Sequence, residues 1–507
     1  MKQNSKKKII SNLAPFILGV ATSFSLPPYN FLIINFIIFP FLILLIIENI
    51  QESKFTVFKI GWFYGFGYFL SSLYWITNAL TFEEIFKPLI PIALIVIPLF
   101  LGLFYGFGIL IFSFFKLEKN LFTILLFSLI FSVIEFVRGF ILGGFPWNLI
   151  VYSWTKYTDF LQILTFIGTY SFNLISITLF LVPSVIFFNN SLRSKIIIII
   201  FSIIFVGTNF YYGKHVKNNY NKLESISLDT TIKIISPRIE IDRFFQNEDP
   251  YKIINELIKL SKPSSEDTIF VFPEGILTSI FLEDIHIYKN FFKDSFLENH
   301  KILLGINSNE NSKIYNSMVV LDNNLNVLSK YNKNKLVPFG EFVPFENMLS
   351  KFGLKKITQG YQSFSSDKVR QIININNLSF VPLICYEIIY SGLINKQNED
   401  FDFLLNISED GWFGETIGPH QHFAHSIFRS IEEGKNLVRS ANNGTSAFIN
   451  PKGQLVDKIK STNSGFIEIK AFRSAKKTFF STYGNMIFFY FIFFYISLIF
   501  FIKKIGR

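Results

Sequence analysis

The sequence predicts a polytopic α-helical membrane bundle that carries a separate α/β domain. Three observations predict it: residues 9–212 and 485–503 are almost entirely apolar, the stretch between them is mixed, and the chain is poor in charge. Charged residues make up 17% of the 507 residues and aromatic ones 18%, with a mean hydropathy of +0.37. Soluble domains carry roughly 25% charged residues, so a simple soluble protein is excluded. The many Phe, Ile and Leu residues exclude disorder.

The apolar regions divide into about eight helices long enough to cross a bilayer. Crossing about 30 Å of hydrocarbon takes about 20 apolar residues in a helix, which satisfies its own backbone hydrogen bonds there. We expect spans near residues 9–26, 29–47, 57–80, 88–115, 121–140, 160–188, 195–212 and 485–503. We expect the first span to stay in the protein, because no convincing signal-peptide cleavage site follows it and another span begins at once.

Basic residues in short loops predict the orientation, because such loops are retained on the cytoplasmic side. The opposite loops are poor in Lys and Arg, although Lys87 lies in one of them. With eight spans the following basic residues fall on one side: Lys2, Lys6, Lys7, Lys8, Lys54, Lys59, Lys116, Lys119, Arg193, Lys195, Lys503, Lys504 and Arg507. We therefore expect a bundle of about seven helices over residues 1–212, an extracytoplasmic domain over 213–484, and a last helix with a cytoplasmic tail over 485–507. Both termini are then cytoplasmic. Much of the net charge of +11 is explained by topology, which weakens a nucleic-acid function.

The outward segment has the pattern of an α/β domain, since short β-branched or aromatic runs alternate with polar amphipathic stretches. We expect strands at 230–235, 268–272, 301–305, 317–321, 378–385 and 401–407, and helices at 251–262 and 421–433. In the second helix Arg429 and Glu433 are spaced to pair, and Gly434 is a stop signal. Glycine-rich phosphate loops of the Walker or dinucleotide type are absent from the sequence.

Three places in this domain put a reactive group at the end of an apolar run. They are Glu274 after 270–273, Lys333 within 331–341, and Cys385, the single cysteine, after 383–384. A carboxylate can transfer a proton, an ammonium can stabilise an oxyanion, and a thiol can act as a nucleophile. Taken singly, each has a plainer interpretation: a solvated loop carboxylate, a solvated lysine cluster and an inert buried thiol. A single cysteine also excludes an internal disulfide.

The order Glu, Lys, Cys resembles the nitrilase superfamily, and with membrane spans on both sides the chain resembles the apolipoprotein N-acyltransferase family. The motifs are Phe272-Pro273-Glu274, Tyr331-Asn332-Lys333, Gly340-Glu341, Cys385-Tyr386-Glu387, Asp410-Gly411-Trp412-Phe413-Gly414 and Arg439-Ser440-Ala441-Asn442-Asn443-Gly444. They span most of residues 228–470. The resemblance implies an αββα sandwich in which Glu274 is the general base, Lys333 the oxyanion stabiliser and Cys385 the nucleophile. It also implies that Glu341, Tyr386 and Glu387 support them and that no cofactor is needed.

Two positions depart from the family pattern. The family usually has an Asn before the Asp of its Asp-x-Trp-Phe-Gly motif, where this chain has Glu409, and a Trp in an early segment where this chain has Phe244. Both departures bear on acyl-chain or lipoprotein contacts rather than on the three reactive groups. His420, His422 and His425 are close enough in sequence to suggest a zinc site, but no Cys accompanies them and the family is metal-free. We therefore expect no metal.

The resemblance implies an acyltransferase of the bacterial inner membrane with its catalytic domain in the periplasm. A phospholipid would acylate Cys385 as a thioester, and the N-terminal amine of a diacylglyceryl-modified apolipoprotein would then accept the chain as an amide. The implied partners are the phospholipid donor, the apolipoprotein acceptor and membrane lipids. Two other functions stay open: a membrane-tethered nitrilase-type amidase, and a transporter or non-catalytic receptor. Glu135 and Arg138 in the fifth span argue only weakly for a function of some kind in the membrane, because their i,i+3 spacing also fits a structural pair.

An apolar stretch between Lys333 and Cys385 offers a route for a lipid to the site. Residues 337–354 carry many large apolar side chains interrupted by Pro and Gly, which disfavours a continuous core strand. We expect a mobile lid whose Phe residues contact the membrane; the alternative is that they pack in the domain core. The side chains expected to contact substrate are Phe244, Phe339, Phe342, Phe345 and Trp412.

Overall fold

The computed structural model describes residues 2–188, 191–246, 248–344, 363–395, 399–473 and 476–505. The chain forms two compact units. The first comprises Met1–Thr77, Lys87–Asn218 and Thr478–Arg507, and the second comprises Asn78–Phe86 and Asn219–Lys477. The loop Asn78–Phe86, which the sequence places inside the bundle, thus belongs to the second unit. The domain boundaries expected at residues 212 and 484 stay a prediction.

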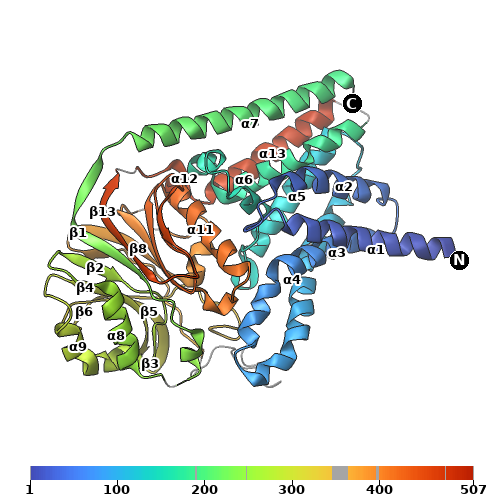
Figure 1. Ribbon diagram of the computed structural model, residues 1–507. Coiled ribbons are helices and arrows are strands. Elements are labelled where there is room, and N and C mark those ends of the chain that lie inside the picture. Colours follow the sequence, from blue (N-terminus) through green and yellow to red (C-terminus); the bar gives the residue numbers. More distant parts are fainter. Residues whose placement is uncertain are drawn as a thin grey trace. The chain divides into compact units, whose positions relative to one another are not determined.

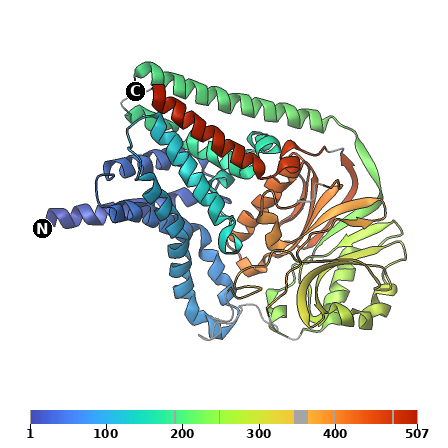
Figure 2. The same ribbon diagram turned by 180° about the vertical axis from the view of Figure 1, so that it is seen from behind.

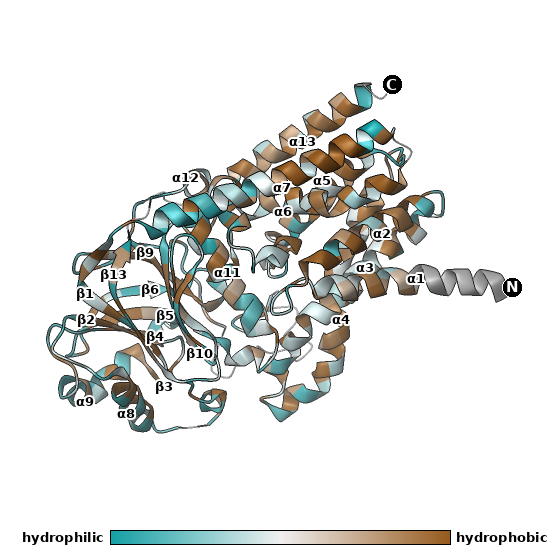
Figure 3. Cartoon of the chain, turned by 45° about the horizontal axis from the view of Figure 1, so that its top comes forward, coloured by the Kyte–Doolittle hydropathy of each residue, from teal (hydrophilic) through white to brown (hydrophobic). Residues whose placement is uncertain are grey.

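The first unit consists of apolar helices, one for each expected span. They are α1 (Lys2–Ser23), α2 (Asn35–Glu48), α3 (Lys54–Leu73), α4 (Ile90–Phe112), α5 (Leu121–Arg138), α6 (Leu164–Leu181), α7 (Leu192–Asn221) and α13 (Met486–Ile505), with the short α12 (Phe479–Tyr483) before the last. Within the described residues, five helical stretches are long and apolar enough to cross a membrane: Glu84–Phe112, Leu121–Arg138, Phe160–Phe187, Leu192–Asn221 and Met486–Lys504. Figure 3 shows α5 and α13 as largely hydrophobic. The chain is therefore a membrane-bound protein.

Close helix packing and one buried ion pair hold this unit together. Helix α13 lies beside α5 and α6, far from it in sequence (Figure 2). A Cβ at Gly67 in α3 would lie 2.1 Å from the Phe16 carbonyl oxygen of α1, so only glycine permits this approach. Arg138 Nη2 lies 3.6 Å from Glu135 Oε1, and both side chains are buried. Tyr105 donates to the same carboxylate. The expected structural pair is thus confirmed.

The second unit contains two mixed β-sheets. The first has the order β13-β1-β2-β4-β5-β6 with β3 beside β4, and the second has the order β12-β11-β10-β9-β8-β7. The strands of the first are β1 (Ser225–Ser236), β2 (Thr268–Val271), β3 (Leu277–Phe281), β4 (Lys301–Glu310), β5 (Lys313–Leu321), β6 (Val327–Asn332) and β13 (Gly465–Arg473). Those of the second are β7 (Ile373–Ile375), β8 (Leu378–Ile384), β9 (Phe403–Glu409), β10 (Asn436–Asn442), β11 (Ser446–Ile449) and β12 (Leu455–Ile459).

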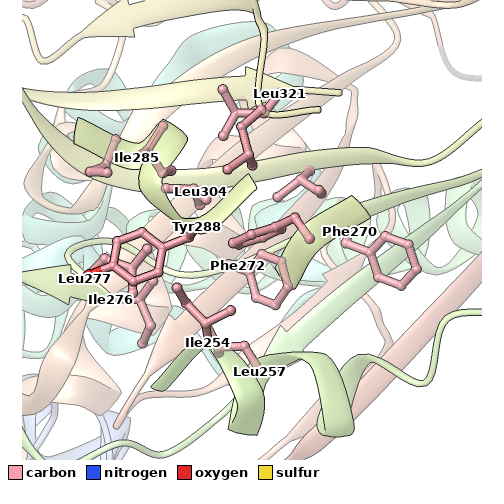
Figure 4. Close-up of a cluster of buried hydrophobic side chains, with 14 of the residues drawn as sticks. Ile254, Leu257, Phe270, Phe272, Ile276, Leu277, Ile285, Tyr288, Leu304 and Leu321 are labelled. Atoms are coloured by element: carbon pink, nitrogen blue, oxygen red, sulfur yellow. The ribbon is translucent and has the colours of Figure 1, made fainter. Parts of the chain in front are cut away.

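Helices cover the outer faces of the two sheets and complete the αββα arrangement. Helices α8 (Pro250–Ser261) and α9 (Lys289–Lys293) lie on the first sheet, and α11 (Gly418–Glu433) packs on β10 and β11 of the second (Figure 1). Under α8, Ile254 and Leu257 pack with Phe270 and Leu304 of the sheet (Figure 4). Fully burying such a side chain contributes about 1.5 to 3 kcal/mol. The predicted fold class, a helical membrane bundle with a nitrilase-like domain, is confirmed.

The predicted strands and helices of this unit all exist, with shifted ends. Strands β3, β6, β7 and β10 to β13 were not predicted. Gly434 ends α11 in the left-handed conformation, as predicted. The pairing of Arg429 with Glu433 stays a prediction. Arg429 Nε lies 2.8 Å from Glu432 Oε2, at a spacing that equally suits a helix, and the Ser391 hydroxyl donates to Glu432 at 2.7 Å.

Candidate active site

The three reactive groups follow the ends of strands, of which β2 and β8 are largely buried. Strand β2 runs parallel to β1 and β4, and β8 runs parallel to β9. The loops that carry Glu274 and Cys385 follow the carboxyl ends of β2 and β8. Glu274 comes three residues after β2, Lys333 directly after β6, and Cys385 directly after β8. All three side chains are buried. The sheets thus present a carboxylate, an ammonium and a thiol from a rigid scaffold.

Glu274 is held at both of its oxygens. Oε1 accepts from Asn316 Nδ2 at 2.8 Å and from Lys333 Nζ at 3.2 Å, and Oε2 accepts from the Glu409 backbone N–H at 2.9 Å. Gly305 on β4 lies against this residue, since a Cβ there would be 2.6 Å from the Glu274 Cα. The absence of a side chain at residue 305 therefore lets β4 approach the loop that carries the carboxylate.

Lys333 sits between two carboxylates. Its ammonium is 2.9 Å from Glu341 Oε1 as well as 3.2 Å from Glu274 Oε1, and the side chain is 1% exposed. Burial alone would lower the pKa of Lys333, but the charges of Glu274 and Glu341 raise it well above its usual range. Lys333 is thus held as a cation. Asn316 joins the cluster because its Nδ2 also donates to Glu341 Oε1 at 2.8 Å.

Cys385 has a strained backbone and a protonated side chain. Its φ is +48°, in the left-handed region that costs a residue with a Cβ about 1 to 3 kcal/mol. Burial and the negative charge of Glu274 raise the pKa of the thiol well above its usual range, while Lys333 and a hydrogen bond with Ser408 act in the opposite direction. At neutral pH the resting side chain is therefore a thiol, which needs a base before it can attack.

Glu387 ties the loop after Lys333 to the segment after Cys385. Its Oε1 accepts from the Tyr331 hydroxyl at 2.6 Å, the Asn334 N–H at 2.9 Å and Arg370 Nη2 at 3.0 Å. Its Oε2 accepts from the Ile384 N–H at 2.8 Å, directly before the cysteine. Glu387 therefore braces both loops. Tyr386, the residue between, is buried and stacks edge-on with Tyr390 at 5.5 Å.

The chain resembles known proteins over nearly its whole length. The family model for the apolipoprotein N-acyltransferase N-terminal domain matches residues 18–182, and the carbon–nitrogen hydrolase model matches residues 294–470. The apolipoprotein N-acyltransferase of Rickettsia prowazekii is 30% identical over 489 residues, covering 95% of each chain. That of Agrobacterium fabrum is 30% identical over 86% of this chain and 85% of its own. That of Brucella melitensis is 29% identical over 90% of this chain and 88% of its own.

The chain belongs to the apolipoprotein N-acyltransferase family. Membership makes it an enzyme of the acyltransferase type, with a carbon–nitrogen hydrolase domain and membrane-spanning helices. The nitrilase-type resemblance inferred from the motifs is thereby confirmed.

An aromatic cluster lies beside the predicted base of this acyltransferase. The Phe244 and Trp412 rings are 4.8 Å apart, and Phe82 and Phe245 lie 5.8 Å and 6.0 Å from Trp412. The Phe244 ring also packs on Gly275, which follows Glu274 with a φ of +56°. Two predicted contact residues, Phe244 and Trp412, are thus together. Phe82 and Phe245 were missed, because Phe82 comes from the distant loop Asn78–Phe86.

The predicted lid is described only at its beginning. The segment starts as a tight turn in which the Val337 N–H donates to Glu341 Oε2 at 2.8 Å and the Phe339 N–H donates to the Phe342 carbonyl at 2.7 Å. Phe339 is exposed and Phe342 half-buried. Phe345 and the rest of the stretch to residue 362 lie outside the described residues. The lid therefore stays a prediction.

Glu409, which departs from the family pattern, forms a buried ion pair with Arg243. Glu409 contacts Arg243 Nη2 and accepts from Asn442 Nδ2 at 2.7 Å, and both charged side chains are at most 1% exposed. Arg243 in turn donates to the Gly275 carbonyl at 3.0 Å. Burial raises the pKa of Glu409 against the opposing charge of Arg243. The pair thus braces the loop that carries Glu274, so the expectation that the departures leave the reactive groups untouched is wrong. Arg243 had no sequence signal of its own.

The histidines do not form a zinc cluster in the described part of the chain. No group of three or more His, Cys, Asp or Glu side chains there is placed to hold a metal ion. His422 instead lies with its Nδ1 2.8 Å from Asp410 Oδ1 and its Nε2 3.2 Å from the Cys385 carbonyl oxygen. The motif residue Asp410 is therefore engaged by His422 and, at 2.8 Å, by Arg439.

Proposed function

We propose that this protein transfers an acyl chain from a phospholipid, through a thioester on Cys385, to the N-terminal amine of the diacylglyceryl-cysteine of apolipoproteins. One observation carries the proposal: the Lys333 ammonium lies 3.2 Å from the Glu274 carboxylate, and the buried Cys385 thiol has a pKa on which both of these buried charges act. The relatives that match this chain are named apolipoprotein N-acyltransferases, and this supports a lipid donor and a lipoprotein acceptor. The proposal also explains why a hydrolase-type domain comes with a helical bundle.

The first half-reaction forms the acyl-enzyme. Glu274 accepts the thiol proton of Cys385 as the sulfur attacks the ester carbonyl of the phospholipid, because the raised thiol pKa leaves too little free thiolate. The charge on the carbonyl oxygen is stabilised by the Lys333 ammonium and the Tyr386 backbone N–H. Collapse of the intermediate breaks the ester bond. Glu274 returns the proton to the leaving oxygen, and the lysophospholipid departs as an alcohol.

The second half-reaction consumes the thioester. The free α-amine of the diacylglyceryl-cysteine attacks the thioester carbonyl and loses a proton to Glu274, while the same two donors stabilise the oxyanion. Breaking the carbon–sulfur bond forms the amide, and the sulfur takes the proton back. This is ping-pong acyl transfer, and it consumes no nucleotide. Both steps require that water be kept from the thioester.

The two carboxylates around Lys333 have different roles in this scheme. Glu274 shares its Oε1 between Lys333 and Asn316, and it is the carboxylate that acts on the thiol electrostatically. Glu341 uses its Oε2 to hold the Val337 N–H, so it anchors the turn that carries it. We therefore assign proton transfer to Glu274 and support of Lys333 to Glu341.

The location of the enzyme belongs to the same proposal. The basic loop residues support a topology with both termini in the cytoplasm of a bacterium and the catalytic domain on the periplasmic side of the inner membrane. Labelling by a membrane-impermeant thiol reagent tests this. In a Cys385→Ala background, a cysteine introduced at exposed Lys313 should react in intact spheroplasts. One introduced at Lys116 should react only after lysis, and the reverse pattern would refute the orientation.

The activity is tested with purified protein and two defined substrates. A phospholipid with an isotope-labelled acyl chain and a synthetic diacylglyceryl-cysteine peptide are incubated with the enzyme in detergent. The proposal predicts that the peptide gains one labelled acyl chain at its amine and that Cys385→Ala does not support the gain. Release of labelled free fatty acid without peptide acylation would instead indicate a hydrolase.

A further inference from the structure

The strained backbone of Cys385 is held from behind by a buried imidazole. The left-handed φ of +48° is unfavourable for a residue with a Cβ, so it persists only where neighbours fix it. His422 on α11 places Nε2 3.2 Å from the Cys385 carbonyl oxygen. Because a carbonyl oxygen can only accept, this contact is a hydrogen bond when Nε2 carries the proton. In the neutral ring Nδ1 is then the acceptor, with Arg439 Nη2 3.1 Å away, and His422 donates to the peptide between Cys385 and Tyr386.

The imidazole is itself fixed by two further buried residues. Its Nδ1 lies 2.8 Å from Asp410 Oδ1, and Arg439 Nη2 donates to both Asp410 oxygens at 3.1 and 2.8 Å. Arg439 Nη2 also lies 3.1 Å from His422 Nδ1. All three side chains are fully buried. They come from α11, from η12 (Asp410–Phe413) and from β10, so three elements converge on one peptide group.

The same carboxylate also reaches the thiol side of the cysteine. The Ser408 hydroxyl donates to Asp410 Oδ1 at 2.7 Å, and both Ser408 and Asp410 act on the pKa of the Cys385 thiol. Asp410 is thus linked to the Cys385 carbonyl through His422 and also acts on the thiol. Both nitrogens of the imidazole face oxygen atoms of other groups, so the ring is not placed to accept the thiol proton.

Holding the Cys385 carbonyl also sets the direction of the next N–H. In a trans peptide the C=O and N–H bonds lie in one plane and point in opposite directions. With the Cys385 carbonyl directed at His422, the Tyr386 N–H must point away from α11. That N–H is the backbone donor assigned to the oxyanion, and such donors act only when they are preorganised. The direction of the oxyanion donor thus depends on a residue that never touches the substrate.

We propose that Asp410, His422 and Arg439 form a positioning network that holds the Cys385–Tyr386 peptide, and with it the nucleophile and the backbone oxyanion donor. This inference rests on the proposed acyl transfer through Cys385. It explains why residues of the Asp410 and Arg439 motifs, which lie outside the three reactive groups, are buried behind the cysteine. His422 is a positioning residue in this account, and the three reactive groups keep their roles.

The test compares His422→Leu with His422→Gln and with His425→Leu. Leucine removes the donor, whereas glutamine keeps an N–H at a similar reach. His425 lies three residues further along α11 and is equally buried, so His425→Leu makes the same chemical change in the same helix. For each folded variant, the rate of Cys385 acylation at saturating phospholipid is measured by mass spectrometry, together with KM. Alkylation of the thiol by iodoacetamide is measured in parallel, because it develops no oxyanion.

The network predicts that His422→Leu slows acylation about 10²-fold, as misplacing a catalytic group does, with KM and the alkylation rate little changed. His422→Gln should recover most of the loss, and His425→Leu should acylate at the wild-type rate per folded molecule. Acylation by His422→Leu at the wild-type rate, or an equal loss in His425→Leu, would overturn the inference. Failure of the wild-type protein to be acylated would instead refute the proposed function, so the two failures are distinguishable.

Discussion

Removing the Lys333 ammonium should make the catalytic domain unstable in a pH-dependent way. Lys333 contacts Glu274 and Glu341 at 3.2 and 2.9 Å, and all three side chains are buried. In Lys333→Ala the two carboxylates share Asn316 Nδ2 with no cation between them, so one must take up a proton. Keeping a carboxyl with an ordinary pKa near 4.3 protonated at pH 7 costs about 4 kcal/mol. The melting temperature should therefore fall by about 8 °C or more at pH 7.

The sign of the pH dependence follows from the same carboxyl. In the variant its pKa is raised in the folded state, so the folded state is favoured at low pH and loses stability as the pH rises above about 4.3. The deficit relative to the wild type should thus shrink to about 1 kcal/mol near pH 5. Adding Glu341→Gln to Lys333→Ala removes one charge and should recover most of the loss at pH 7.

Thermal unfolding of the purified protein in detergent, followed by intrinsic fluorescence between pH 5 and pH 8, measures both effects. Lys335→Ala is the matched control, because it removes a lysine two residues away that contacts neither carboxylate in the described structure. It should change the melting temperature little. A deficit in Lys333→Ala that does not vary with pH, or that Lys335→Ala reproduces, would refute the charge arrangement described here. Acyl transfer by Lys333→Ala should also fall about 10² to 10³-fold through loss of an oxyanion donor.

Four further outcomes are expected. Cys385→Ala should abolish both half-reactions and Cys385→Ser nearly so, since an alkoxide forms far less readily than a thiolate; transfer of labelled chain by Cys385→Ala would contradict this. Alkylation of Cys385 in the folded protein should keep rising above about pH 10, where a thiol with an ordinary pKa levels off, because its pKa is raised; a plateau by about pH 10 would be inconsistent with burial beside Glu274. Arg243→Leu and Glu409→Gln should each destabilise the protein by about 3 to 5 kcal/mol and the double variant by less, as measured by melting; additive losses would count against the pair. Phe342→Ser combined with Phe345→Ser should slow acylation by bilayer phospholipid far more than alkylation by a water-soluble reagent; equal slowing would place these residues in the core.

The sequence predicted those features that depend on local pattern. Apolar length and basic loops predicted the helices of the bundle, and the apolar runs before Glu274 and Cys385 predicted β2 and β8. Glu274 and Cys385 each follow such a run, whereas Lys333 was found from its place in the ordered motifs that resemble the family. Strands β11 and β12 were not predicted, because sheet pairing to distant partners decides them more than local propensity does.

The contacts that link distant segments could not be predicted. Asn316 joins Glu274 to Glu341 from the middle of the second unit, and nothing near it in sequence indicates that role. Arg243 pairs with Glu409, which lies 166 residues further along the chain. The sequence indicated His422 only as a candidate zinc ligand. The spacing of residues within its helix does not reveal that the side chain contacts the Cys385 carbonyl, which follows the distant strand β8.

The most direct test of the account is intact mass analysis of the purified wild-type protein after incubation with a single phospholipid species and no acceptor. The account predicts a gain of one acyl chain per molecule, located on the peptide that contains Cys385, removable by neutral hydroxylamine as thioesters are, and discharged when the diacylglyceryl-cysteine peptide is added. Absence of that adduct, or an equal adduct in Cys385→Ala, would contradict the central claim that the chain passes through this thiol.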